Sequence, residues 1–354
     1  MRIKLEKRAE PSRVMLFATP IVAVILTMII GAVLFDALGY DGQRTVKEIF
    51  FTPVLASYKW LDVAARAAPL IIIALGLSLG NQAKVWNIGA EGQYIVGALC
   101  GAIVAYFTQS ATGSWVIIPM MLAGIAGGAA WAAIPALLKT KFNVNEVLTS
   151  LMLVYVALQV LSYIVTGPLK DPHGQNFPQT APFTDAQLLP RAIGNIIPPG
   201  LLVAFILMLG FWLLVSRSVY GFEVRVVGAA PSAARYAGFD ASSTVWSTML
   251  ISGGMAGLAG ILEATSQLGQ LNLGFPSGYG FTAIIVSFLG RLHPVGVFIA
   301  GIVLAITYVG GQVAQTVVHV PSASGGVFQA LMLFLILAAD ILVRYRVRLV
   351  RGAA

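Results

Sequence analysis

The residues best suited to chemistry in this chain form one short polar run, Asn87 to Gln93, which includes Glu91 among glycines. The run lies between the apolar stretches 70–79 and 94–107. A carboxylate and two carboxamides are costly to hold at membrane depth, so such a cluster is a functional-site hypothesis by default. Glycines weaken a helix, and backbone groups freed there are tolerated only against protein or a water-filled path. The run therefore predicts a broken helix or a pore lining. The alternative is a tight turn at a membrane surface, with Glu91 solvated.

The composition places these residues in a membrane protein. Hydrophobic residues make up 58% of the 354 positions and charged residues 10%, against roughly 25% charged in a soluble domain. The sequence predicts an all-α polytopic integral membrane protein with one transmembrane domain, 14–343, because repeated apolar stretches approach the length that spans a bilayer. About ten transmembrane helices are expected, near 14–35, 67–83, 92–108, 115–138, 146–166, 199–216, 243–262, 278–290, 294–313 and 325–343.

The basic residues set the expected orientation. If the N-terminus is cytoplasmic, most of the 22 lysines and arginines fall in inside segments, which agrees with the positive-inside rule. Both ends, 1–13 and 344–354, are then basic cytoplasmic segments that face anionic lipid. This accounts for the net charge of +8 without a nucleic-acid partner. The single Cys100 excludes an intrachain disulfide and a cysteine metal cluster, and no metal site is expected.

Three connectors are long. The outside segment 36–66 mixes charges with aromatic residues, as an amphipathic segment lying along the interface would. The outside segment 167–198 is rich in proline, which predicts an extended loop without a core of its own. That loop is either a plain connector or a platform for an external partner. The third connector, 217–242, is the longest on the cytoplasmic side.

A weak internal repeat relates the polar run to a second segment. Asn87–Tyr94 aligns with Asn272–Tyr279 at an offset of 185 residues, and Gln82 and Gln267 keep that offset. The expected topology inverts one segment relative to the other, and inverted repeats with interrupted helices are how many transporters build a central substrate path. The residues expected along this path are Asn87, Glu91, Gln93, Tyr94, Glu263, Gln267, Asn272 and Tyr279.

The cytoplasmic connector predicts a short docking helix. Pro231 suits the first turn of a helix, Ser232–Tyr236 is a short alanine-rich helix, and Gly238 ends it. A rigidly held helix with small surface residues fits a groove of another protein. The alternative is a surface helix on the bilayer, with Arg225 and Arg235 on lipid phosphates.

Together, the run Asn87–Gln93 and the segment Gly228–Gly238 resemble the permease subunits of bacterial ABC importers, in the nucleoside and simple-sugar branch related to ribose and branched-chain amino acid permeases. The resemblance covers nearly the whole chain. It implies an importer in the bacterial cytoplasmic membrane, with two permease subunits, a cytoplasmic ABC ATPase and an extracytoplasmic substrate-binding protein. It also implies that the helix coupling to the ATPase comprises Gly228, Ala229, Ala230, Pro231, Ser232, Ala233, Ala234, Arg235, Tyr236 and Gly238.

The resemblance leaves the substrate open between nucleosides and simple sugars, because ribose permeases carry a different sequence at Ala90–Gly92. The length and basic N-terminus look like the larger of two non-identical permeases that pair as a heterodimer. A second subunit identical to this one stays open.

The energy source must lie in another subunit. The sequence has no Gly-x-x-x-x-Gly-Lys-Ser/Thr phosphate loop, so ATP and Mg²⁺ are expected on the ATPase, with no cofactor and no enzymatic activity in this chain. An ion-coupled secondary transporter of small polar solutes is the alternative, since it would also use Glu91 and Glu263. An intramembrane hydrolase would need Ser324 and His319 as nucleophile and base, which normally come from different helices.

Overall fold

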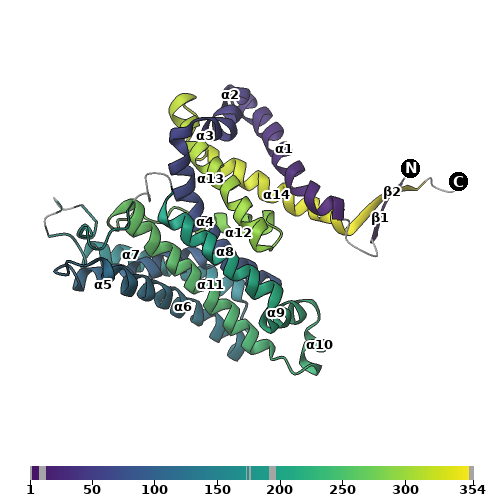
Figure 1. The fold of residues 1–354 in the computed structure, drawn as a ribbon. Coiled ribbons are helices and arrows are strands. Elements are labelled where there is room, and N and C mark those ends of the chain that lie inside the picture. The colour runs from purple at the N-terminus through teal and green to yellow at the C-terminus, as the bar shows by residue number, and fades with distance from the viewer. Residues whose placement is uncertain (1, 8–12, 173, 175–176, 191–196, 351–354) are drawn as a thin grey trace. The chain divides into compact units, whose positions relative to one another are not determined.

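The computed structural model describes residues 2–7, 13–172, 174, 177–190 and 197–350, and helices dominate them (Figure 1). Among these residues, eight helices are long and apolar enough to cross a membrane. The chain divides into two compact units, residues 61–305 and residues 1–60 with 306–354.

The larger unit contains most of the long helices. Its elements are α4 (Trp60–Gln82), α5 (Ala90–Phe107), a 3₁₀ turn (Ser114–Val116), α6 (Ile117–Phe142), α7 (Glu146–Thr166), α8 (Pro199–Arg217), α9 (Val219–Ala229), α10 (Pro231–Tyr236), α11 (Ala241–Glu263), a π-helical turn (Ala264–Leu268), α12 (Tyr279–Leu289) and α13 (Pro294–Val317), whose last turns belong to the smaller unit.

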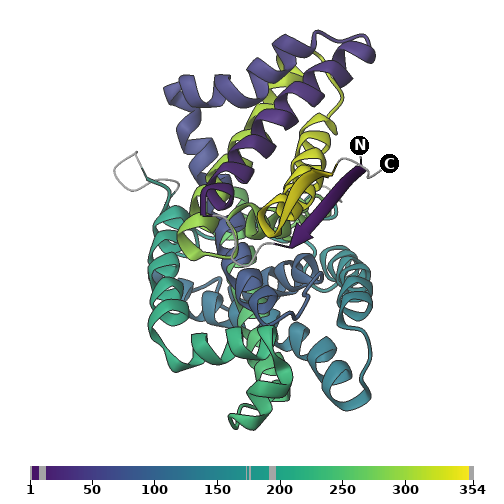
Figure 2. The ribbon, with the colours of Figure 1, turned by 90° about the vertical axis from the view of Figure 1, so that its right-hand side faces the viewer.

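The smaller unit brings the two ends of the chain together. Its elements are β1 (Arg2–Lys7), α1 (Arg13–Ala37), α2 (Gly42–Val46), a π-helical turn (Lys47–Phe51), α3 (Thr52–Leu55), a 3₁₀ turn (Ser57–Lys59), α14 (Ser324–Arg344) and β2 (Tyr345–Val350). Helix α1 packs along α14, and β1 pairs antiparallel with β2, as Figure 2 shows. The sequence did not predict these two strands.

An aromatic cluster holds this unit together. The ring of Phe328 on α14 stacks on Phe35 of α1 with centroids 5.5 Å apart, and Phe50 packs edge-on against it at 5.6 Å. Phe50 belongs to the segment 36–66, which is predicted to lie along the interface. This segment folds as short helical turns up to Lys59, and its last residues form the start of α4. Part of its aromatic content is therefore core, because Phe50 is buried whereas Tyr58 is exposed.

Every predicted span coincides with a helix. Eight of the ten fall on the long apolar helices, which confirms the polytopic helical class. The other two fall on shorter apolar helices, Tyr279–Leu289 and Ser324–Ala339. Helix α12 is short because it begins only after Gly278, whose φ of +75° no ordinary helical residue adopts.

Glycines allow three helices of the larger unit to approach closely. A Cβ on Gly257 of α11 would collide with the backbone of Gly124 on α6, and one on Gly97 of α5 would collide with Gly257. Gly128 and Gly253 face each other in the same way. In lipid, the hydrophobic effect does not drive membrane helices together, so their association depends on close packing. Small residues permit that close packing. Helices α5, α6 and α11 accordingly run side by side (Figure 1).

Two helix breaks interrupt this bundle. The first follows α4, where Lys84 has a φ of +58° and α5 begins at Ala90. The second follows the π-helical turn, where Gly269 has a φ of +71° and α12 begins at Tyr279. The run Asn87–Gln93 thus lies across the end of the first break and the first turn of α5, which contains Glu91. The alternative of a solvated Glu91 is wrong, because this side chain is only 2% exposed.

Candidate functional site

The side-chain carboxamides of Asn87 and Gln93 form two reciprocal hydrogen bonds at the start of α5. Asn87 Nδ2 donates to Gln93 Oε1 at 2.7 Å, and Gln93 Nε2 donates back to Asn87 Oδ1 at 3.0 Å. Asn87 Nδ2 also donates to Ser252 Oγ on α11 at 2.9 Å, and Gly89 N donates to Asn87 Oδ1 at 3.2 Å. All three side chains are buried. They fix the turn before α5 against the middle of α11.

Glu91 joins the two helix breaks. Its Oε1 accepts the backbone N–H of Gly278 at 2.9 Å, and its Oε2 accepts that of Gly280 at 2.6 Å. These N–H groups belong to the N-terminus of α12, where intrahelical partners are missing and a negative charge is favourable. A Cβ on Gly280 would collide with the backbone of Glu91. The N-terminus of α12 therefore rests directly on the N-terminus of α5.

An aromatic cluster lies beside this junction. Tyr94 stacks on Phe275 with centroids 4.8 Å apart, and Tyr279 meets Tyr94 edge-on at 6.0 Å. The two tyrosines that the repeat alignment paired are thus in contact. Arg66 Nη1 of α4 donates to the Tyr279 hydroxyl at 2.9 Å. Aromatic and basic groups from α4, α5 and α12 meet here, and Glu263 at the end of α11 is buried.

Gln267 and Asn272 lie further along the second break. Both are half-buried, Gln267 in the π-helical turn and Asn272 in the connection to α12. Asn272 Oδ1 accepts from Gly274 N at 2.9 Å. All eight residues predicted for the path therefore lie on or beside the two helix breaks, with six buried and these two half-buried.

The proline-rich segment 167–198 folds over the second break. The described part of this segment leaves out residues 173, 175–176 and 191–196. The rest makes backbone hydrogen bonds to the segment 264–272. Thr180 N donates to Leu271 O at 2.8 Å and Phe183 N donates to Gly269 O at 2.8 Å. The described part of the loop contains no helix, and these hydrogen bonds anchor it to the second break.

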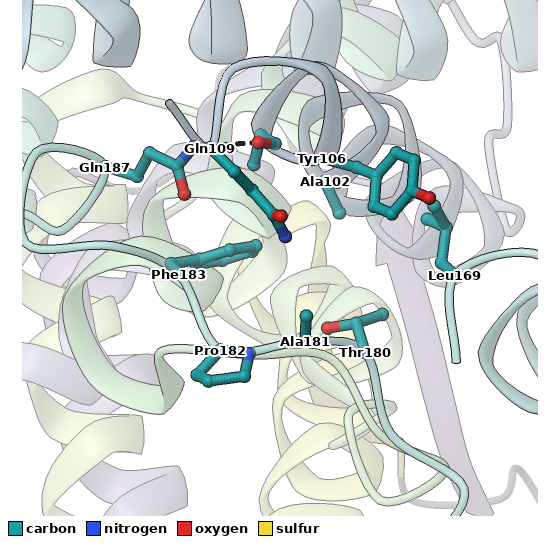
Figure 3. Close-up of a pocket in the computed structure, with 10 residues that line it drawn as sticks. Ala102, Tyr106, Gln109, Leu169, Thr180, Ala181, Pro182, Phe183 and Gln187 are labelled. Atoms are coloured by element: carbon teal, nitrogen blue, oxygen red, sulfur yellow. Dashed lines mark hydrogen bonds between the residues drawn. The ribbon is translucent and has the colours of Figure 1, made fainter. Parts of the chain in front are cut away.

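A small pocket lies between this loop and the end of α5 (Figure 3). Tyr106 and Gln109 border one side, and Pro182 and Phe183 of the loop border the other. Gln187 Nε2 donates to Ala105 O at 2.8 Å and ties the loop to α5. With a volume of about 10 Å³, the pocket has room for about one water. It is a packing gap in the loop and not a substrate cavity.

The connector 217–242 contains the predicted short helix. Helix α10 runs from Pro231 to Tyr236, and Gly238 ends it with a φ of +84°. Ala234 is fully buried, whereas Ala233 is exposed and Tyr236 is 95% exposed. The helix borders an open hollow of about 1080 Å³, lined by Pro231, Ser232, Arg235, Tyr236, Gly238, Phe239, Asp240 and Ala241. It presents one protruding aromatic ring beside a concave surface.

A second helix in this connector, α9, was not predicted. Arg225 Nη1 donates to Val215 O at the end of α8 at 2.5 Å, and Thr244 Oγ1 of α11 donates to Glu223 Oε1 at 2.9 Å. Tyr220 OH donates to Ser247 Oγ of α11 at 2.8 Å. Burial raises the pKa of the Tyr220 phenol above its ordinary value. These bonds hold α9, and with it α10, firmly on α8 and α11.

Sequence reasoning missed Arg66 because it was counted as an outside charge and not as a partner of Tyr279. Ser252 was missed because a lone serine in an apolar span carries no signal of its own. Within the described residues, no group of three or more His, Cys, Asp or Glu side chains could hold a metal ion.

Comparison with known proteins identifies the family. The family model for the permease component of branched-chain amino acid transport systems matches residues 60–337. The chain belongs to this permease family. It is 34% identical to the glucose ABC transporter permease protein TsgB13 of Haloferax volcanii, over 98% of this chain and 94% of that protein.

Two further relatives are named for nucleosides. The guanosine ABC transporter permease protein NupP of Bacillus subtilis is 28% identical, over 94% of this chain and 95% of that protein. The nucleoside ABC transporter permease protein NupB of Lactococcus lactis is 24% identical, over 82% of each chain. No solved structure matches this chain. This multi-pass permease thus has relatives that serve sugars and relatives that serve nucleosides.

Proposed function

We propose that this permease is the membrane-spanning subunit of an ABC importer that moves simple sugars or nucleosides. Glucose and guanosine or other nucleosides are the substrates for which its relatives are named. Both classes carry hydroxyl groups that carboxamides, which donate and accept hydrogen bonds, can recognise. Among the residues expected along the path, Gln267 and Asn272 supply such groups in half-buried positions.

The proposed path follows the junction of the two helix breaks. Interrupted helices in corresponding positions are typical of substrate paths in transporters. The observation that carries this proposal is the contact of the two breaks through Glu91 and the N-terminus of α12. Tyr94 and Tyr279 would contact the substrate when the cluster that they form with Phe275 opens. Glu263 and Arg66 would supply charge beside the substrate.

The proposed partners follow from the same function. A cytoplasmic ABC ATPase would bind and hydrolyse ATP with Mg²⁺, an extracytoplasmic protein would deliver the substrate, and a second, non-identical permease would complete the path. The bias of lysines and arginines supports cytoplasmic termini in the bacterial inner membrane. The pairing of β1 with β2 agrees with both ends lying on one side of the membrane, because it keeps them together.

Helix α10 is the proposed coupling element. It is short, held by α9, and exposes Ala233 and Tyr236 beside the open hollow. Buried aromatic residues commonly supply about 2 kcal/mol or more to an interface. Tyr236 is the residue of α10 that fits this role, because its ring is almost fully exposed in the isolated chain.

The test places a charge on this helix. Ala233→Glu should leave membrane insertion intact, because the residue is exposed, but should abolish uptake and weaken copurification of the ATPase. Tyr236→Ala should weaken copurification as well. Ser110→Glu, at an exposed position of the turn after α5, adds the same charge elsewhere and should change neither result. Full ATPase copurification with wild-type uptake in Ala233→Glu refutes coupling through α10, and uptake by the purified chain without any ATPase supports a secondary transporter.

A further inference from the structure

Gln82, the last residue of α4, contacts two elements that lie far from it in the sequence. Its Nε2 donates to Leu292 O, just beyond α12, at 2.8 Å. Its backbone carbonyl oxygen faces Gly228 of α9 so closely that a Cβ on Gly228 would collide with it. One residue therefore joins the cytoplasmic connector to the C-terminal end of α12.

Helix α12 is held at both ends by one stretch of chain. At its start, Glu91 accepts the N–H groups of Gly278 and Gly280. At its end, Gln82 Nε2 donates a hydrogen bond to Leu292 O, and Asn81 Nδ2 donates to Ser287 Oγ at 3.3 Å. With 11 residues, α12 is about 16 Å long. It forms a short rod between the cytoplasmic end of α4 and the helix break at Glu91.

The backbone just after α12, where Leu292 O accepts the hydrogen bond from Gln82, has an unusual conformation. Arg291 and Leu292 both have a φ of +56°, a strained region that residues with a Cβ rarely occupy. Surrounding contacts must maintain such a turn, and the bond from Gln82 to Leu292 O is one of them. A shift of Gln82 would therefore weaken a hydrogen bond that helps to maintain the turn that ends α12.

We propose that Gln82 is a positioning residue that transmits movement of α9 and α10 to α12, and through α12 to the helix break. Gly228 makes the contact direct, because no side chain stands between α9 and the Gln82 carbonyl to absorb a displacement. Coupling between distant sites needs contiguous packed elements of this kind. The inference rests on the proposed function, in which an ATPase moves α10.

The test separates the hydrogen bond from the fold. Gln82→Met keeps the chain length and removes the donor, whereas Gln82→Lys keeps an N–H donor. Gly228→Ala adds one methyl group at the contact with Gln82 O, and Gly210→Ala on α8 is its matched control because a Cβ there meets nothing within 4 Å.

The readout needs no known substrate. Hydrogen exchange of the peptide 278–292 is measured in the complex with its ATPase, with and without a non-hydrolysable ATP analogue. In the wild type, Gln82→Lys and Gly210→Ala, the analogue should change exchange by about fivefold or more, the usual lower end of coupling between sites. In Gln82→Met and Gly228→Ala this response should disappear while the ATPase still copurifies.

Three results would overturn the inference: a wild-type response in Gln82→Met, an equal loss in Gln82→Met and Gln82→Lys, or no response of this peptide in the wild type. Loss of the ATPase from Gln82→Met would also overturn it, because the residue would then serve assembly. If no ATPase associates with the wild-type chain, the proposed function fails and this inference fails with it. A bound ATPase with unchanged exchange refutes the inference alone.

Discussion

Glu91→Gln tests whether the carboxylate holds the N-terminus of α12. Both carboxylate oxygens accept a backbone N–H, from Gly278 at 2.9 Å and from Gly280 at 2.6 Å. Glutamine has nearly the same shape but offers one oxygen and one NH₂ group. One of the two backbone donors would then face another donor in a site that is 2% exposed.

The expected loss follows from these two bonds. A buried N–H left without an acceptor costs about 1–3 kcal/mol, and the remaining bond loses roughly 1 kcal/mol because a charged acceptor becomes neutral. The start of α12 should therefore lose about 2–4 kcal/mol of stabilisation. At 1.4 kcal/mol per factor of ten, its opening equilibrium should shift by roughly 30- to 1,000-fold.

Hydrogen exchange of the peptide 276–286 in the purified protein measures this shift directly, because local opening sets the exchange rate of protected amides. Asp185→Asn makes the same chemical change at an exposed position of the proline-rich loop 167–198 and serves as the control. Uptake should fall in Glu91→Gln and stay at the wild-type level in Asp185→Asn, with equal amounts of each protein in the membrane. Unchanged exchange in Glu91→Gln would show that the carboxylate does not hold α12.

Two other predictions concern packing and orientation. Gly257→Val should lower the stability of the fold by about 1–3 kcal/mol if the helices can part slightly, because the new side chain meets the backbone of Gly124. Gly210→Val should leave the melting temperature unchanged. Equal melting temperatures of the two variants would contradict the close helix contact. In a Cys100→Ser background, Asp185→Cys should react with an impermeant thiol reagent in intact cells and Ser232→Cys should not. The reverse labelling pattern would invert the orientation inferred from the basic residues.

The sequence predicted those features that depend on local chemistry. Apolar length located the eight helices of the described residues that are long enough to cross a membrane, because a membrane helix must be apolar over a set distance. Pro231 and Gly238 bounded α10 correctly, because proline fits the first turn of a helix and glycine accepts a positive φ at its end. Helix α9 was missed because Gly221 and Gly228 lower helix propensity within it. Close contacts with α8 and α4 require glycine at both positions and override that propensity.

Long-range pairings were beyond sequence reasoning, and the internal repeat shows why. The alignment at an offset of 185 paired Tyr94 with Tyr279, and their rings do meet. Yet Tyr279 opens α12, whereas α5 begins at Ala90. The two breaks therefore place equivalent residues at different depths of their helices. An alignment cannot show this shift, because it depends on where each backbone turns.

The role of Glu91 illustrates a deeper limit. A carboxylate among glycines at membrane depth predicts a group with a special partner, and the structure supplies that partner as the backbone of Gly278 and Gly280. A carboxylate that lines a path and one that caps a half-helix require the same residue types, since both need donors that apolar side chains cannot provide. Under the proposed function, capping and path formation are linked in this chain. The break that needs the cap is also the interruption that transporters use to open a path, so Glu91 can serve transport by holding α12 without contacting the substrate.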